Sequence, residues 1–430
     1  MDADTSTEAA KTARRGRLWY ADMSPNERRT FWACFGGWAT DAFDVQMFSL
    51  VLTVLLSTGF LASNGEAGTI ATITLVSSAF GGWVAGLLAD RFGRITMLKV
   101  SVCWFAVFAC ACGFAQDDLQ LGGLRALMGL GFGGEWAVGA VLMAETVRAG
   151  IRGRAVGGVQ AAWSVGWGAA VVLYVVVSDG VSDDWLWRIM FWAGLLPALL
   201  VLYIRRHVEE PPLARRTAGP RPGLAGVLQI FHPEFLGRTV LCSLIAVGAQ
   251  GGYYALTTWL PQFLEEERGL EVLALGGTLA VVIVGAFVGY LLGADLSDRL
   301  GRRWTLVVTS ILALAISLVF TLLHPSTAVF TVLCFPLGMF SAAYFSSLGP
   351  LFSEQYPTRI RASGQGFCYN FGRGIGALFP SAIGFLSDRI EVGTAIAVFA
   401  GSAYALLAIC ALVVRERDDV DIDTVDEALA

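Results

Sequence analysis

The sequence predicts an all-α integral membrane protein, with twelve transmembrane helices in two pseudo-symmetric six-helix bundles. Of its 430 residues, 55% are hydrophobic and 15% are charged, whereas soluble domains carry about 25% charged residues. Apolar stretches of about 20 residues, the length that crosses a bilayer as a helix, recur along the chain. Short motifs of the first half return in the second half, which indicates a duplicated unit.

Twelve apolar stretches are the expected membrane spans. They fall near residues 30–57, 69–89, 96–115, 121–145, 156–178, 187–205, 238–263, 273–295, 305–323, 327–352, 363–386 and 393–414. Fifty glycines and thirteen tryptophans fit this class, because small residues allow close helix packing and Trp favours membrane interfaces. The eight cysteines lie within these spans, at spacings that suggest neither a disulfide framework nor a metal site.

A Pro- and Arg-containing segment separates the first six spans from the last six. The predicted organisation is a cytoplasmic N-terminal segment (1–29), an N-terminal bundle (30–205), a cytoplasmic linker (206–237), a C-terminal bundle (238–414) and an acidic cytoplasmic tail (415–430). The tail has the charged composition of a disordered segment.

Basic residues predict the orientation of the spans. Lys and Arg gather before the first span, in the even-numbered connections and after the last span, and the opposite side carries Arg125, Arg188, Arg268 and Arg389. The positive-inside rule then places both termini in the cytoplasm. We expect a multi-pass protein of the cell inner (plasma) membrane.

Two motifs recur in the two halves at almost the same offset. Gly86 to Arg94 reads GLLADRFGR, and Ala294 to Arg303 reads ADLSDRLGRR, at an offset of 208 residues. A Glu…Arg pair follows the fourth span and returns after the tenth, at an offset of 209 residues. A duplicated six-helix unit with a binding site between its halves is a common plan of transporters.

These loop motifs and the six-plus-six layout resemble the major facilitator superfamily. In the first span, residues 38–44 read WATDAFD, which resembles the signature of the sialate:proton and aromatic-acid:proton symporters. The run from Val45 to Leu55 looks closer to the sialate group, which includes lactate and pyruvate permeases, and residues 131–136 (GFGGEW) support the placement. Ala42 stands where many relatives have glycine.

The resemblance implies the superfamily fold, alternating access and a gating role for charged residues of the connections. These residues are Asp90, Arg91, Arg94, Asp298, Arg299, Arg302, Glu145, Arg152, Glu354 and Arg361. Asp90 is expected to cap a helix N-terminus across the interface of the halves, and Arg94 to bridge an acid there.

Three acids and one arginine lie inside predicted spans, where ionisable side chains are expensive and usually functional. Asp41 is about eleven residues into its span, or about 16 Å deep. Asp44 follows three positions later on the same face. Because two neighbouring carboxylates cannot both ionise cheaply, the pair suits a proton acceptor; the alternative is a hydrogen-bonded packing pair. Glu135 is expected to have a coupling or gating role; the alternatives are a buried protonated Glu bonded to a neighbouring backbone group, or a partner for Arg125 nearer the outer end.

Arg373 lies near the middle of the eleventh span and is expected to bind a substrate carboxylate. The alternative is a permanent bridge from Arg373 to an acid. The offset of 209 maps Asp41 to Gln250, Asp44 to Tyr253, and Ser164 to Arg373, so the N-terminal half would handle protons and the C-terminal half the anion. Further candidate substrate contacts, each as readily explained by helix packing, are Gln250, Tyr253, Tyr254, Gln160, Trp163, Tyr369, Asn370, Tyr344, Gln46 and Gln365.

We therefore expect a secondary active transporter that imports a small organic anion by proton symport. Candidate substrates are lactate, pyruvate, benzoate-type acids and sialic acid. No nucleotide loop or catalytic constellation is present, so we expect no enzyme activity and no cofactor, with the proton gradient as energy source. The expected partners are the anion, protons and the lipid bilayer, without nucleic acid or an obligatory protein partner, and a monomer is plausible. The alternatives are a neutral sugar or polyol symporter or facilitator, and a drug or metabolite exporter.

Overall fold

The computed structural model describes residues 20–207, 228–323, 327–357 and 360–416. The rest of the predicted N-terminal segment, most of the linker and the tail from residue 417 lie outside these ranges. The helices are α2 (Pro25–Ser57), α3 (Asn64–Phe92), α4 (Arg94–Cys112), α5 (Asp118–Thr146), α6 (Ala149–Ser178), α7 (Asp183–Ala193), α8 (Ala198–His207), η1 (Gln229–Phe231), α11 (Pro233–Gln262), η2 (Phe263–Glu267), α12 (Val272–Arg299), α13 (Arg302–Leu322), α14 (Thr327–Ala343), α15 (Phe345–Glu354), α16 (Arg361–Gly376), α17 (Leu378–Ser387) and α18 (Val392–Val413).

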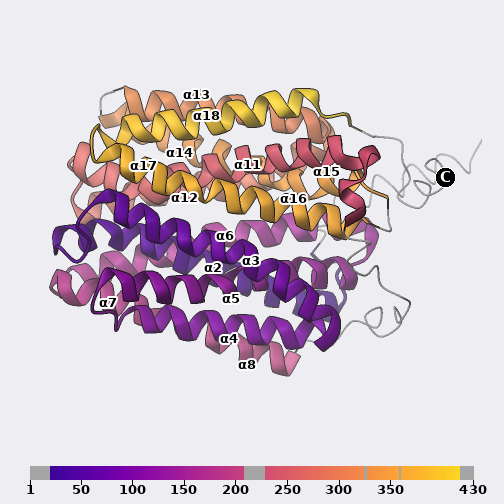
Figure 1. Cartoon of the computed structure of the whole chain (residues 1–430), viewed down its shortest axis with the longest axis horizontal. Coiled ribbons are helices and arrows are strands. Elements are labelled where there is room, and N and C mark those ends of the chain that lie inside the picture. Colours follow the sequence, from indigo (N-terminus) through magenta and orange to yellow (C-terminus); the bar gives the residue numbers. More distant parts are fainter. Residues whose placement is uncertain (1–19, 208–227, 324–326, 358–359, 417–430) are drawn as a thin grey trace, which may run out of the picture.

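These helices form the twelve expected spans. The sixth, tenth and eleventh spans are each broken into two helices: α7 with α8, α14 with α15, and α16 with α17. Within the described ranges, nine helices are long and apolar enough to cross a membrane. In Figure 1 the helices α2 to α8 lie in the lower layer and α11 to α18 in the upper layer, all running along the long axis. The fold is therefore two six-helix bundles side by side.

The two ends of the bundle are named here by their connections. The terminal end is where α2 begins and α18 ends, and it also holds the turns at Gly93 and Gly301. The far end holds the connections at residues 58–63, 113–117, 179–182, 268–271 and 388–391. The two glycines have φ of 95° and 86°, which an L side chain rarely adopts. They occupy the same position of the repeated loop motif, so the same tight turn ends α3 and α12.

Glycines allow the closest helix contacts in both halves. The Cβ of an alanine at Gly81 would overlap the backbone of Leu130, where α3 crosses α5. The corresponding position of the second half is Gly289, where a Cβ would overlap the backbone of Met339 as α12 crosses α14. Backbones that approach so closely gain packing contacts in lipid, where apolar burial alone drives little association. The duplicated packing explains why the glycines recur at the offset of the loop motifs.

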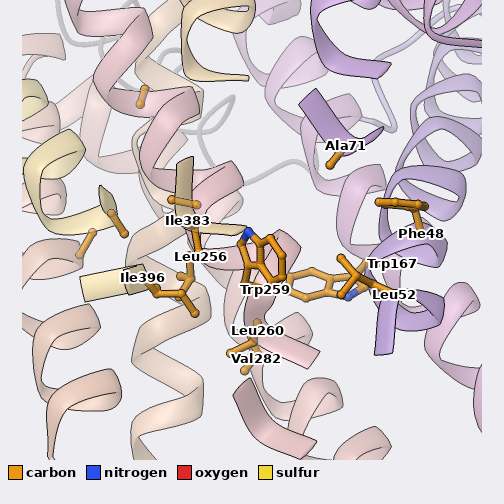
Figure 2. Close-up of a cluster of buried hydrophobic side chains, with 14 of the residues drawn as sticks. Phe48, Leu52, Ala71, Trp167, Leu256, Trp259, Leu260, Val282, Ile383 and Ile396 are labelled. Atoms are coloured by element: carbon orange, nitrogen blue, oxygen red, sulfur yellow. The ribbon is translucent and has the colours of Figure 1, made fainter. Parts of the chain in front are cut away.

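The halves contact each other through α2 with α11, α3 with α16 and α17, and α6 with α12. Near the far end, an apolar cluster fills the interface (Figure 2): Phe48, Leu52 and Trp167 come from one half, and Leu256, Trp259 and Ile383 from the other. Trp259 donates its indole N–H to the carbonyl of Pro380 at 3.1 Å, which fixes the ring in this cluster. The cluster separates the middle of the interface from the far end.

Hydrogen bonds also close the far end. The Asp388 carboxylate accepts the amide N–H of Asn64 at 3.1 Å and of Gly65 at 3.3 Å, so a residue of the second half caps α3. Thr72 donates its hydroxyl to the carbonyl of Ala377 at 2.6 Å. Further hydrogen bonds between the halves on this side join Thr69 to Ser381, Gln262 to Asn64, and the Ser381 N–H to the Thr72 hydroxyl. The structure is therefore in a state closed toward the far end.

Candidate functional site

Two carboxyl groups meet in the middle of the N-terminal half. Asp41 of α2 and Glu135 of α5 are only 1% and 2% exposed, and their carboxyl groups lie within hydrogen-bonding reach of each other. Gly37, one helical turn before Asp41, makes room for Glu135, because a Cβ there would overlap its carboxyl oxygen Oε1. Asp41 Oδ2 and Glu135 Oε2 have no hydrogen-bond partner among the described residues. The two acids thus form a buried pair with acceptor atoms to spare.

Arg373 reaches toward this pair from the other half. It lies on α16, is 1% exposed, and its guanidinium stands over the rings of Phe132 at 4.9 Å and Tyr369 at 5.3 Å. The hydroxyls of Tyr254 and Tyr369 are within hydrogen-bonding reach of it, and Asp41 interacts with it electrostatically. Its Nε and Nη1 atoms have no hydrogen-bond partner in the described part of the chain. A buried cation with unused donors suits an anionic ligand, because unsatisfied buried donors are costly.

Aromatic rings from both halves line the same region. Trp163 of α6 lies 4.9 Å from Trp38 and 6.2 Å from Tyr253, measured between ring centroids. Tyr253 continues the row to Phe345 at 5.4 Å, which lies 6.3 Å from Tyr290. These five residues form an aromatic wall that crosses the interface of the halves.

The remaining acid, Asp44, has a partner of its own. Arg125 of α5 donates to Asp44 Oδ2 at 2.8 Å, and the two side chains are 2% and 0% exposed. The Arg125 guanidinium also stands over Phe48 at 4.6 Å and Phe191 at 5.8 Å. A fixed ion pair therefore joins α2 to α5.

This pairing corrects two expectations. Asp41 and Asp44 do not form one carboxylate pair, and Arg125 pairs with Asp44 and not with Glu135. Positions three apart differ in direction by about 60° around a helix axis, which suffices to aim the two acids at different partners. Arg125 lies in the second turn of α5, and its long side chain carries the charge inward. The core thus holds two arginines against three acids.

The other predicted contact residues divide into two groups. Trp163, Tyr253, Tyr254 and Tyr369 surround the site, and Gln160 is buried one turn before Trp163 on α6. The second group uses its polar atoms inside the C-terminal half. Gln250 donates to the carbonyl of Tyr369 at 2.7 Å, Tyr344 to that of Ala249 at 3.1 Å, and Asn370 to that of Gly366 at 2.9 Å.

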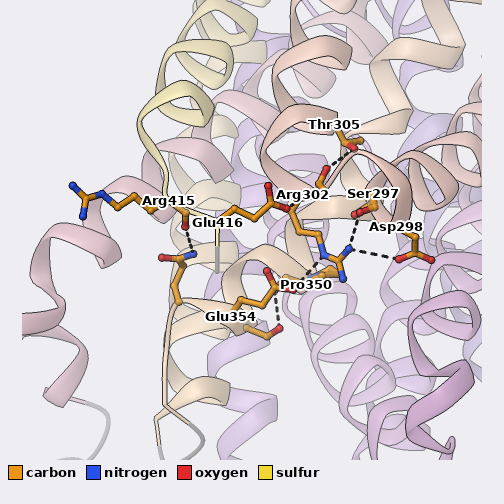
Figure 3. A network of polar contacts seen from close by, with 11 residues as sticks. Ser297, Asp298, Arg302, Thr305, Pro350, Glu354, Arg415 and Glu416 are labelled. Carbon is orange, nitrogen blue, oxygen red and sulfur yellow. Dashed lines mark hydrogen bonds and ion pairs between the residues drawn. The ribbon is translucent and has the colours of Figure 1, made fainter. Parts of the chain in front are cut away.

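Charged residues of the loop motifs gather at the terminal end. Arg302 lies 3.2 Å from Glu354 and 3.6 Å from Asp298, and it donates to the carbonyl of Ser297 at 2.6 Å (Figure 3). Glu416 accepts the backbone N–H of Arg302, so it caps the first turn of α13. The network ties four segments of the C-terminal half together.

The structure describes the side chains of only some of the remaining predicted gating residues. Arg299 pairs with Asp295 at 2.8 Å, Arg361 donates to the carbonyl of Tyr356 at 3.4 Å, Arg91 stands over Phe92 and Arg94 is half-buried. The side chains of Asp90, Glu145 and Arg152 lie outside the described part of the structure, so the expected cap by Asp90 is not placed.

Comparison with known proteins shows to which family this chain belongs. The family model of the Major Facilitator Superfamily matches residues 34–380 and 275–427. The chain belongs to this superfamily. It is 40% identical over 413 residues to a probable 4-methylmuconolactone transporter of Cupriavidus pinatubonensis, which covers 95% of both chains. It is 28% identical over 385 residues to a cis,cis-muconate transport protein of Acinetobacter baylyi, covering 88% of this chain and 92% of that one.

A solved structure of the superfamily has the same fold. The inward open xylose transporter XylE from E. coli superposes with a TM-score of 0.72 at 18% identity, covering 93% of this chain and 98% of that one. The resemblance and fold predicted from the sequence are thus confirmed. Because the superfamily and these relatives are transporters, the chain is a multi-pass transporter of metabolites and not an enzyme.

Several residues that line the site around Asp41, Glu135 and Arg373 were not predicted from the sequence. Trp38 and Phe132 each lie three positions before a predicted acid, Asp41 and Glu135, and so share its helix face. A search for aromatic residues at that spacing would have found both. Tyr290 and Phe345 carry no such signal, because nothing in the sequence says that α12 and α15 turn these rings toward the site.

Proposed function

We propose that the chain imports an organic carboxylate together with protons across the cell inner membrane. The observation that carries the proposal is Arg373, a buried guanidinium with unused donors, beside Asp41 and Glu135, whose carboxyl groups lie within hydrogen-bonding reach of each other. A carboxylate matches the guanidinium in charge and shape, and a pair of buried acids can load and release a proton. The relatives named as transporters of muconolactone and muconate support an organic acid as the substrate.

Each part of the site then has a role. Arg373 binds the substrate carboxylate, with help from the hydroxyls of Tyr254 and Tyr369. Asp41 and Glu135 carry the proton. Asp44, although near them in sequence, holds α2 against α5 through Arg125. The substrate body lies along the aromatic wall, with Gln160 as a further contact, while three residues position the helices that carry the site: Gln250, Tyr344 and Asn370.

Transport follows alternating access. With the terminal end in the cytoplasm, as the Lys and Arg distribution favours, the far end faces outward and the structure represents a state closed to the outside. Proton loading and anion binding leave the site neutral, which lets the two halves rock about it. The network around Arg302, with Arg299 and Arg361, would open and close the cytoplasmic side, together with the N-terminal loop charges Asp90, Arg91, Arg94, Glu145 and Arg152. The proton gradient is the energy source, and no cofactor takes part.

Uptake into proteoliposomes tests the proposal. The substrates are a muconolactone, cis,cis-muconate, benzoate, lactate and xylose, each with and without an inward proton gradient. We expect at least one acid to accumulate only with the gradient. Arg373→Ala should lower this uptake by at least about 30-fold, because removing one member of a buried charge pair costs about 2–5 kcal/mol.

Arg389→Ala is the matched control, since Arg389 is an exposed arginine of the far end. It should keep wild-type uptake. The proposal is refuted if only xylose moves, or if Arg373→Ala transports the acid as well as the wild type does.

A further inference from the structure

The ionisable groups around the site lie on five of the helices that pack on it. They are Cys34 and Asp41 of α2, Glu135 of α5, Tyr253 and Tyr254 of α11, Tyr290 of α12, and Tyr369 and Arg373 of α16. Phenols and thiols are neutral near pH 7 in water. Asp44 and Arg125 neutralise each other. The charge of the site is therefore set by Asp41, Glu135 and Arg373.

These three groups form a neutral set when one proton is present. Asp41 and Glu135 lie within hydrogen-bonding reach of each other, and a hydrogen bond between two carboxyl groups requires a proton on one of them. The pair then carries one negative charge, as do other carboxyl pairs that share a proton. That charge balances the guanidinium of Arg373. The empty site is neutral, as burial demands.

A bound carboxylate changes this balance by one unit. When it pairs with Arg373, the charge on the Asp41–Glu135 pair loses its counter-ion. An uncompensated carboxylate in a buried site is costly, so the pair takes up one more proton. Building on the proposed function, we infer that the transporter carries one proton with each singly charged carboxylate, and that the cycle moves no net charge.

The same balance selects the charge of the substrate. A dicarboxylate would bring a second negative charge, and the one other arginine that the described core places in the membrane interior, Arg125, is engaged by Asp44. A dianion therefore leaves the loaded site charged. The site favours monocarboxylates, and the aromatic wall around Trp163 and Tyr253 favours a planar, unsaturated or cyclic body that can stack on its rings.

Proton and substrate fluxes measured together test the stoichiometry. Proteoliposomes with an entrapped pH indicator take up a radiolabelled unsaturated monocarboxylate, and the ratio of protons to substrate should be one. A potassium diffusion potential set with valinomycin should leave the accumulation unchanged. Each net charge moved would alter it about 50-fold per 100 mV, so a potential-dependent accumulation overturns the inference.

Variants test whether the two acids act as one proton site. Asp41→Asn and Glu135→Gln each leave one acid beside Arg373, so the ratio should stay at one. The double variant should lose the dependence on the proton gradient. If the acids loaded protons independently, the wild type would move two protons and each single variant one. Should a variant fail to fold, the wild-type ratio and its response to the potential still decide.

A matched pair of probes tests the selection by charge. cis,cis-Muconate and its monomethyl ester share a skeleton and differ by one charge. We expect the monoester to accumulate at least about tenfold more, and equal accumulation with a one-proton ratio would overturn the selectivity. The failures are distinguishable: if no carboxylate responds to the gradient, the proposed function itself is wrong, whereas gradient-driven uptake with a ratio of two refutes only the stoichiometry.

Discussion

Replacing Asp44 by asparagine removes the carboxylate that faces Arg125 and keeps the size of the side chain. The partners are 2.8 Å apart and almost fully buried, so their attraction is about 6 kcal/mol at an effective dielectric constant of about 20. Taking both ions out of water costs several kcal/mol each, which cancels much of this gain. The intact pair therefore adds little net stability.

The single variant is different because it leaves one charge behind. The Nε atom of Arg125 already has no hydrogen-bond partner among the described residues. The cation–π contacts of its guanidinium with Phe48 and Phe191 stabilise the charge by only about 2 kcal/mol. Breaking a buried pair in this way costs about 3–5 kcal/mol. We expect Asp44→Asn to be destabilised by that amount.

Equilibrium unfolding of the purified protein in detergent measures the effect. Arg125→Met should lose a similar amount, whereas the double variant Asp44→Leu with Arg125→Met should lie within about 1 kcal/mol of the wild type. Asp184→Asn, an exposed acid of the far end, is the control and should change stability by less than about 0.5 kcal/mol. The reasoning fails if Asp44→Asn is as stable as the control, or if the double variant loses the sum of the two single effects.

Two glycine substitutions are expected to separate function from stability. Gly37→Ala should push the Glu135 carboxyl away from Asp41 and reduce gradient-driven uptake about tenfold, equivalent to about 1.4 kcal/mol. Its control is Gly123→Ala, whose added Cβ meets open space, so this variant should transport normally. Equal uptake by the two variants would contradict this packing. Gly289→Ala should force α12 from α14 and lower the free energy of unfolding by about 1–3 kcal/mol. Its control, Gly277→Ala on the same helix, meets nothing within 4 Å and should not lose stability.

The sequence predicts well those features that depend on the residues of a single helix. Span length, the repeated loops and the depth of Asp41 and Arg373 depend on the distance along the chain, which a count of residues supplies. Which side chains of different helices contact each other cannot be read from the distance along the chain. Asp41 and Asp44 are three residues apart, yet one contacts Glu135 and the other Arg125, because the choice depends on which neighbour each helix face meets. By contrast, the break of the eleventh span after Gly376 has a local signal in the sequence, because Pro380 has no N–H to donate to the carbonyl four residues earlier and its ring clashes with that carbonyl.

Capping of α3 by Asp388 makes two backbone amides into reporters of conformation. The N–H groups of Asn64 and Gly65 belong to the first turn of a helix, where no carbonyl of the same helix can accept them. Their acceptor belongs to the other half of the protein. Hydrogen–deuterium exchange at these amides should be slow while the far end is closed and fast once the halves separate there. A single peptide at the start of α3 would then record how substrate, pH or a variant divides the population between the two states.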